Sequence, residues 1–247
     1  MQLHLQTWPE VEAYLQTSHG IILPIGSTEQ HGPVGVIGTD AICAELIARG
    51  VGEETGALVG PTIGVGMAQH HMAFPGSITL RPSTLIAVLR DIVESLAHHG
   101  FERFYFINGH GGNIATIAAA FSEIYAARSL SPDGGAGPLK CRLRNWWHGQ
   151  GVGQLAKELY GDAEGSHATP SEVAVTQFAY PQAVKSAPLN PQIAPRGEFS
   201  DAAEYRRNFP DGRIGSNSAL ATPEAGKRLY EAAVAALAKD YLAWVAA

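Results

Sequence analysis

Short apolar runs alternate along this chain with longer segments whose apolar residues recur at helical spacing. Strands are expected at 21–25, 57–59, 103–107 and 139–147, and helices at 39–49 (with Thr39 or Asp40 as the N-cap), 82–99 and 222–246. Strands that alternate with helices predict an α/β fold in which a mainly parallel sheet carries helices on both faces.

The rest of the pattern adds no second domain. Residues 131–138 resemble a linker, and 186–217 are rich in Pro, Gly and charge with weak periodicity, so long loops are expected there. A length of 247 residues suits one large core, and we predict a single domain over 1–247.

Composition narrows the functional class. Apolar residues make up 45% and charged residues 16% of the chain, which is typical of a globular protein. A net charge of −6 disfavours nucleic acid or an anionic membrane as partner, since both require a basic surface. The sequence shows no secretory signal and no apolar run of about 20 residues, the length that a membrane span needs. Its two cysteines are far apart, so we expect a cytoplasmic protein with reduced thiols.

Polar clusters follow three expected strands, where open α/β sheets place their sites. In the first cluster, Glu29 and His31 point to the same side of an extended segment. Asp40 follows at the start of a helix, and two carboxylates with an imidazole suit a divalent transition metal. The alternative is a polar loop with a capping Asp.

The second cluster is the segment 108–113, which holds His110 among glycines. Glycines at a helix start also suit phosphate binding, but neither common nucleotide-binding glycine motif is present. A histidine at a strand end is better placed as a metal ligand than as a core residue.

The third cluster is 165–172. Pro170 suits the first turn of a helix, which places Glu172 in that turn and His167 in the preceding loop. Glu172 taken alone is better explained as a first-turn carboxylate that favours the helix dipole than as a functional residue. Together, however, Glu29, His31, Asp40, His110 and Glu172 suffice for two metal ions that share one carboxylate.

The ordered motifs E-Q-H-G-P with Asp40 downstream, H-x-x-F-P-G-S at 71–77, N-G-H-G-G-N, and H-A-x-x-x-E at 167–172 resemble the creatininase (creatinine amidohydrolase) family. They cover about residues 20–180. The resemblance implies a three-layer αβα sandwich, two divalent metals per chain (zinc, manganese or iron), hydrolysis of a non-peptide C–N amide bond and a homohexamer.

Carried over by motif, the resemblance implies that Glu29, Asp40 and His110 hold one metal, and that His31 and Asp40 hold the other. Creatininase itself has a ligand Glu where this chain has Gly112, so Glu172 is expected to supply that carboxylate, as ligand or as catalytic base. His167 matches a catalytic histidine that transfers a proton near the substrate.

The expected substrate-binding residues are His71, Ser77, Gly111, Gly112 and Trp146. Trp146 matches one of two tryptophans that close over creatinine, whereas Ala163 stands where the second would fall. A substrate other than creatinine is therefore expected, either another cyclic amide or a formamide, attacked by metal-activated water.

Two rival hypotheses remain. The first is a Rossmann-like protein that binds a nucleotide or phosphate at the glycine-rich turns around Gly64 and Gly109. The second is a family member that binds metal but has lost catalysis. Elemental analysis separates the first from the amidohydrolase, and an activity assay separates the second.

Overall fold

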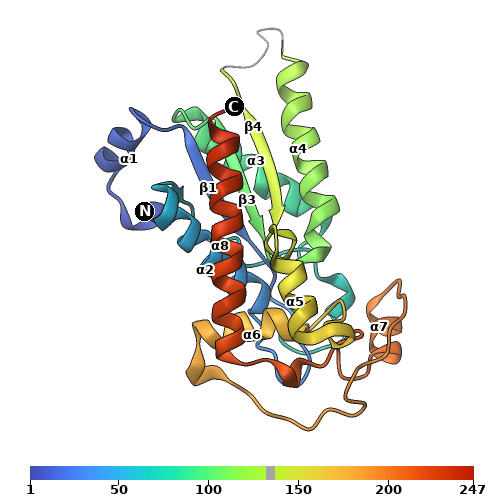
Figure 1. Cartoon of the computed structure of the whole chain (residues 1–247). Coiled ribbons are helices and arrows are strands. Elements are labelled where there is room, and N and C mark those ends of the chain that lie inside the picture. Colours follow the sequence, from blue (N-terminus) through green and yellow to red (C-terminus); the bar gives the residue numbers. More distant parts are fainter. Residues whose placement is uncertain (132–136) are drawn as a thin grey trace.

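The chain forms a parallel four-stranded sheet with the order β2-β1-β3-β4 (Figure 1). This computed structural model describes residues 1–131 and 137–247, so most of the expected linker at 131–138 lies outside the described residues. The strands are β1 (Gly20–Ile25), β2 (Leu58–Val59), β3 (Arg103–Asn108) and β4 (Lys140–Asn145).

Helices connect the strands and form the C-terminal part of the chain. They are α1 (Trp8–Leu15), α2 (Thr39–Thr55), α3 (Pro82–His98), α4 (Ile114–Ser129), α5 (Val152–Tyr160), α6 (Pro170–Ala179), α7 (Ala202–Asn208) and α8 (Pro223–Val245). Short 3₁₀ turns occur at Leu3–Leu5, Gln69–His71, Gly111–Asn113, Trp146–His148, Gly161–Ala163, Pro181–Ala183 and Ser218–Leu220.

Each face of the sheet builds its own core because successive side chains of a strand point to opposite sides. Ile22 of β1 packs with apolar residues of α2, α5, α6 and α8. Ile21 and Leu23 point the other way and pack with α1, α3 and α4. The expected αβα sandwich is therefore confirmed, with α8 in front of the sheet and α3 behind it in Figure 1.

The carboxyl ends of three strands lie at one level. Ile25 of β1 pairs with Asn108 of β3, which in turn pairs with Asn145 of β4. The Asn108 side-chain amide also donates to the Asn145 side-chain oxygen (2.9 Å). The polar loops after β1 and β3 consequently leave the sheet side by side.

Several expected boundaries were wrong. Helix α2 has Gly38 as its N-cap and runs to Thr55, so Thr39 and Asp40 lie inside its first turn, and the Asp40 side chain does not cap the helix. Strand β4 stops at Asn145, because the chain then turns to bury Trp146.

Three helices were not predicted from the sequence pattern. Helix α7 lies within 186–217, where only loops were expected, and is stabilised by Asp201, which accepts from the backbone N–H of Glu204 (2.8 Å). Helices α1 and α5 were also not predicted. All three have fewer than ten residues, too short to establish a clear 3.6-residue period.

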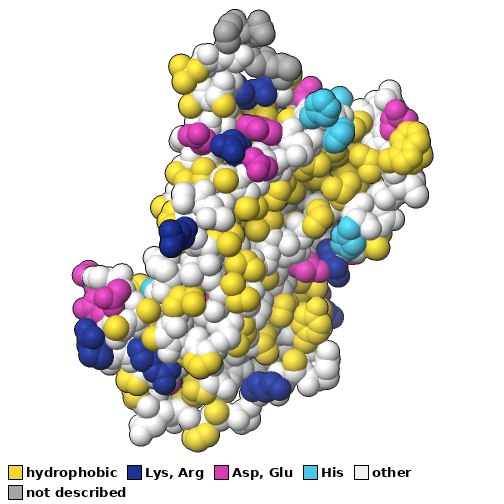
Figure 2. Space-filling view, turned by 180° about the vertical axis from the view of Figure 1, so that it is seen from behind, with side chains coloured by type: hydrophobic (Ala, Val, Ile, Leu, Met, Phe, Trp, Pro, Cys, Tyr) yellow, Lys and Arg dark blue, Asp and Glu magenta, His cyan; other side chains and the backbone are white. Residues whose placement is uncertain are grey.

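Seen from behind, hydrophobic side chains form a band across the middle of the molecule (Figure 2). The large apolar side chains that are exposed to solvent include Trp8 (78% exposed) and Leu130 (83% exposed). Exposed apolar area is common where subunits meet, but the homohexamer stays a prediction. Within the described residues, every helix is too short or too polar to cross a bilayer.

Candidate metal centre

The loop after β1, the start of α2, the loop after β3 and the start of α6 converge beyond the carboxyl edge of the sheet. Their close approach depends on glycine. A Cβ on Gly109 would collide with the backbone oxygen of Asp40, and a Cβ on Gly26 would collide with the backbone of Ala41. Without side chains at these two positions, the loop after β3 and the end of β1 pack directly against the first turn of α2.

A first cluster joins Glu29, Asp40 and His110, all buried. His110 Nδ1 lies 3.2 Å from Glu29 Oε1 and 3.1 Å from Asp40 Oδ2. One ligand atom from each of the three residues falls within 4.8 Å of the others. This is the group that the resemblance to the creatininase family implied for one metal.

A second cluster joins His31, Asp40 and Glu172. His31 Nε2 lies 3.0 Å from Asp40 Oδ1 and 3.8 Å from Glu172 Oε2. Asp40 belongs to both clusters and turns a different oxygen toward each histidine. All five residues that the sequence proposed as metal ligands are thus brought together.

Backbone carbonyls orient both ligand histidines. His31 Nδ1 lies 3.1 Å from the carbonyl oxygen of Glu29, and His110 Nε2 lies 3.0 Å from that of Met67. A carbonyl only accepts, so these nitrogens carry a hydrogen. The opposite nitrogen of each ring faces the carboxylates, and once it has lost its proton its lone pair is free to bind a cation held between them. Metal-ligating histidines are commonly held in this way.

The carboxylate oxygens also fit a cation. Glu29 Oε1 and Oε2 and Asp40 Oδ2 are buried and have no hydrogen-bond partner among the described residues. Such orphan oxygens are costly unless a positive charge occupies the gap between them. Two ligand atoms bound tetrahedrally to zinc at 2.0–2.2 Å would lie roughly 3.3 Å apart, close to the separations in the first cluster.

The charges of the metal-free site compensate one another. Burial disfavours a charged His31, but Asp40 and Glu172 hold its pKa at about 10. Burial likewise opposes a charged His110, yet Glu29 and Asp40 raise its pKa well above the usual value. Protons on these rings neutralise the carboxylates, so metal binding must release them.

Glu29 and Glu172, the carboxylates that each belong to one Asp40 cluster, have opposite pKa shifts. Burial alone would raise the pKa of Glu29, but His110 and His71 hold it well below its ordinary value. Burial raises the pKa of Glu172 to about 7, with His31 opposing the shift and Asp40 adding to it. Glu29 is therefore ready to hold a cation at neutral pH, whereas Glu172 gives up a proton as a cation arrives.

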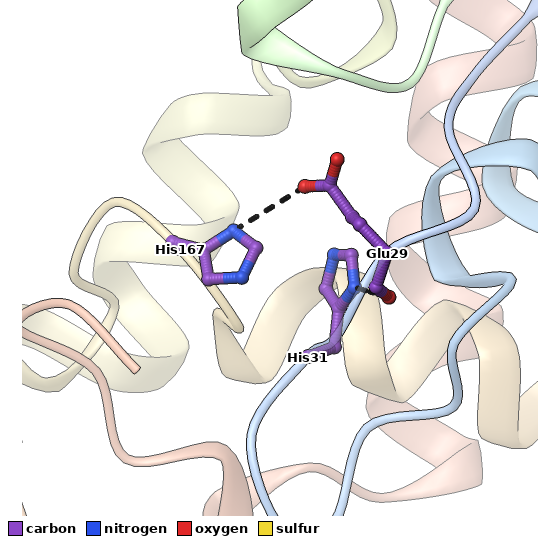
Figure 3. Close-up of side chains that lie close together, drawn as sticks. All are labelled: Glu29, His31 and His167. Carbon is purple, nitrogen blue, oxygen red and sulfur yellow. Dashed lines mark hydrogen bonds and ion pairs between the residues drawn. The ribbon is translucent and has the colours of Figure 1, made fainter. Parts of the chain in front are cut away.

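His167 points at this centre from the loop before α6. Its Nδ1 lies 3.8 Å from Glu29 Oε1, with the His31 ring alongside at a centroid distance of 4.6 Å (Figure 3). Glu29, His31 and His167 also form a third group whose ligand atoms lie within 4.8 Å. Burial, together with His71 and His31, lowers the pKa of His167 well below its usual value, so the ring is neutral.

A cavity of about 400 Å³ opens onto the centre. Asp40, His110, His167 and Glu172 border it, together with Gly111, Trp146, Trp147, His148, Val152, Gly153, Glu164 and Ser166 among others. Trp146 is 1% exposed and packs in the core, so little of its surface faces the cavity. Ala163, which precedes the cavity residue Glu164, is buried, so a small side chain stands where the resemblance places a second tryptophan.

The other proposed substrate-binding residues lie elsewhere. His71 and Gly112 border a smaller cavity of about 170 Å³ beside His110 and His167. Ser77 lies beneath the first polar loop, where its hydroxyl accepts the backbone N–H of Gln30 (3.1 Å). The substrate role of these residues stays a prediction.

Sequence reasoning missed the aromatic wall of the smaller cavity and the residue between the histidines. His70, Phe199 and Tyr205 form that wall, and the Tyr205 ring meets the His71 ring edge-on at 4.7 Å.

Gln30 lies between His71 and His167. Its position inside E-Q-H-G-P was a signal, but an extended backbone places it opposite Glu29 and His31.

Comparison with known proteins extends over nearly the whole chain. Residues 4–241 match the profile of the creatininase family, described as creatinine amidohydrolase. A solved structure of creatininase with Mn superposes with a TM-score of 0.81 at 26% identity, covering 97% of this chain and 96% of that chain.

Two curated relatives match over shorter segments. A mycofactocin precursor peptide peptidase of Mycolicibacterium smegmatis is 37% identical over 106 residues, 40% of this chain and 42% of that protein. A creatinine amidohydrolase of Pseudomonas putida is 34% identical over 113 residues, 43% of this chain and 44% of that protein. The matched segments span less than half of either relative. These matches do not favour the nucleotide-binding hypothesis.

Proposed function

The chain belongs to the creatininase family, and from this membership we propose that it is a dinuclear-metal amidohydrolase that cleaves a C–N bond in a small amide. The observation that carries the proposal is the position of Asp40 between two ligand clusters, with Oδ1 near His31 and Oδ2 near His110. A carboxylate that turns one oxygen toward each of two ligand clusters suits a two-metal site, whose ions lie roughly 3.5–4 Å apart.

Glu29, Asp40 and His110 would hold one ion, and His31, Asp40 and Glu172 the other. Zinc, manganese and iron all suit this mixture of imidazole and carboxylate ligands. When bound, two such ions supply activation of a water molecule and polarisation of the amide carbonyl. The protein contributes the fixed ligand geometry and a partly enclosed cavity around it.

His167 is the residue that we assign to proton transfer. Its ring is neutral and Nδ1 faces the centre next to Glu29. A neutral imidazole there can take a proton and give it to the leaving nitrogen of the amide. Glu172 would serve as a ligand, since its Oε2 faces His31.

The cavity limits the size and kind of substrate. A space of about 400 Å³ bordered by Trp146, Trp147 and His148 suits a small ring or a short formamide. Because Ala163 offers no aromatic surface, a clamp over creatinine would have one side fewer, and we propose another cyclic amide or a formamide. The likeness to a peptide peptidase adds a short peptide amide as a second class to test.

The test combines metal analysis with turnover. Purified protein is expected to carry up to two transition-metal ions per chain, and the metal-replete protein to hydrolyse at least one of hydantoin-like rings, lactams, formamides or short peptides. Chelation should abolish turnover, and metal should restore it. A metal-free chain whose stability responds to phosphate would favour the nucleotide-binding rival, and bound metal without turnover on any amide would favour an inactive scaffold.

A further inference from the structure

We infer that Gln30 is a positioning residue that makes His71 present a hydrogen to Glu29, whereas His31, His110 and His167 present a lone pair in the metal-loaded protein. The inference deepens the proposed function and rests on it in one respect, the role of Glu29 as a ligand.

The orientation of the Gln30 amide is fixed at both ends. Its Oε1 accepts the backbone N–H of Gly32 (2.8 Å), and its Nε2 donates to the carbonyl oxygen of Gly212 (3.0 Å). Exchanging the two ends would set an amide NH₂ against an N–H and one oxygen against another. Nε2 is therefore the end that faces the histidines, and it can only donate.

This donor determines the hydrogen on His71. Gln30 Nε2 lies 2.9 Å from His71 Nδ1, so a hydrogen on that nitrogen would meet another donor. His71 Nδ1 must accept, and the neutral ring then carries its hydrogen on Nε2. That nitrogen lies 3.1 Å from Glu29 Oε1, and both groups are buried. The approach is not aligned as a hydrogen bond, but it sets a positive dipole against the carboxylate.

The same residue has the opposite effect on His167 through its backbone. His167 Nε2 lies 2.9 Å from the carbonyl oxygen of Gln30, which only accepts, so the hydrogen is on Nε2 and the lone pair is on Nδ1. The Gln30 Nε2 atom is also 3.0 Å away, but His71 and Gly212 already take its two hydrogens. His167 thus resembles His31 and His110, each held by a backbone carbonyl.

The hydrogen on His71 Nε2, where the other three histidines present a lone pair, can orient the Glu29 carboxylate. Among the described residues, neither carboxylate oxygen of Glu29 has a hydrogen-bond partner, so no hydrogen bond fixes the rotation of the carboxylate. A hydrogen presented by His71 attracts Oε1 and keeps the carboxylate facing His110, whereas a lone pair there would repel it. Tyr205 supports the arrangement by donating to the same Gly212 oxygen (2.8 Å).

The decisive measurement is magic-angle-spinning NMR of the zinc-loaded protein labelled with ¹⁵N-histidine, which distinguishes protonated from bare ring nitrogens. His71→Gln and His167→Gln assign the two signals by their loss. In the unaltered protein, His71 and His167 are both expected to carry the hydrogen on Nε2. In Gln30→Glu, the new carboxylate can accept, so His71 Nδ1 is expected to become protonated while His167 is unchanged.

Gln69→Glu is the matched control, because it makes the same chemical change on an exposed side chain two residues from His71. It should leave both tautomers as they were. Loss of a partner of this kind should lower zinc affinity or kcat by about 10–100-fold in Gln30→Glu. A hydrogen on His71 Nδ1 in the unaltered protein, zinc bound at His71 Nε2, or an unchanged His71 in Gln30→Glu would each overturn the inference. The tautomers are read without turnover, so failure of the proposed activity is separable.

Discussion

Asp40 Oδ2 lies 3.1 Å from His110 Nδ1, so the first turn of α2 meets the loop after β3 through these two side chains. The contact exists because the carboxyl ends of β1 and β3 lie at one level of the sheet. The other carboxylate oxygen of Asp40, Oδ1, lies 3.0 Å from His31 Nε2. Removing this one carboxylate therefore affects both clusters, which makes it the sharpest test of the metal assignment.

Asp40→Ala is expected to release both metals while leaving the fold largely intact, since Gly38 and not Asp40 is the N-cap of α2. The measurement is metal content per chain by elemental analysis, with circular dichroism to check the fold. The exposed Asp162 supplies the control variant Asp162→Ala, which should keep full occupancy. Full metal content in Asp40→Ala would show that Asp40 does not bridge.

Glu172→Gln is expected to weaken one metal and spare the other. The neutral amide loses the charge that faces His31, but its oxygen can still accept the backbone N–H of Thr169, a bond that Glu172 Oε1 now accepts at 2.6 Å. Helix α6 should therefore keep its capped first turn. Occupancy close to one ion per chain, measured against metal concentration, is the expected result, and two tightly held ions would remove Glu172 from the ligand set.

His167→Ala should retain both metals and lose turnover by roughly 10²–10⁴-fold, the usual size of a general acid–base contribution. The ring faces the centre without belonging to either of the two clusters that contain Asp40. Comparison of kcat with metal content in the same preparation checks this. Loss of an ion would instead make His167 a ligand in the group with Glu29 and His31.

Creatinine is expected to be a poor substrate. The missing aromatic surface at Ala163 should cost on the order of 0.5–1.5 kcal/mol of stacking energy, and Gly112 shifts one carboxylate ligand to another part of the backbone. Steady-state kinetics with the metal-replete protein decide the point. A kcat/KM for creatinine of about 10⁴ M⁻¹s⁻¹ or more, the ordinary range of enzymes, would contradict this expectation.

Asp240 offers a pH test away from the centre. It accepts from Arg144 Nε (2.9 Å) and from the Tyr105 hydroxyl (2.7 Å). Burial would raise the pKa of Asp240, but these partners hold it below its ordinary value. A lowered pKa in the folded state stabilises the fold above about pH 3.9, and this contribution disappears as the pH falls through the folded-state pKa.

Asp240→Asn should consequently lower the free energy of unfolding by about 1 kcal/mol at pH 7, a value reduced for the partial exposure of the carboxylate. The difference from the unaltered protein should shrink below about pH 4. Urea unfolding of both proteins at pH 7 and pH 3.5 measures it. The control Asp162→Asn changes an exposed side chain and should alter the free energy of unfolding by no more than about 0.5 kcal/mol at both pH values. If the loss of stability in Asp240→Asn were equally large at pH 3.5, the ion pair would be excluded as its cause.

Local sequence patterns predicted the parts of the fold that repeat a period over many residues. The long helix α3 and the strand β3 were expected almost to the residue, whereas α5 and α7 are too short to show a period. The site was predictable because its five candidate ligands follow strands or begin helices. The position of Gln30 was not predictable, because its partners Tyr205, in α7, and Gly212, just after α7, are more than 170 residues away and meet it only in the folded chain.

Glu172 divides its carboxylate between two tasks. Oε1 accepts the backbone N–H of Thr169 in the capping box of α6, and Oε2 is left to face His31. Rotating the carboxylate would break the cap, so its torsional freedom is already lost in the metal-free protein. Ordering a side chain of this type on binding costs about 0.5–1.5 kcal/mol. Here folding meets that entropic cost before any ligand arrives, so the second site is preorganised by the helix that begins beside it.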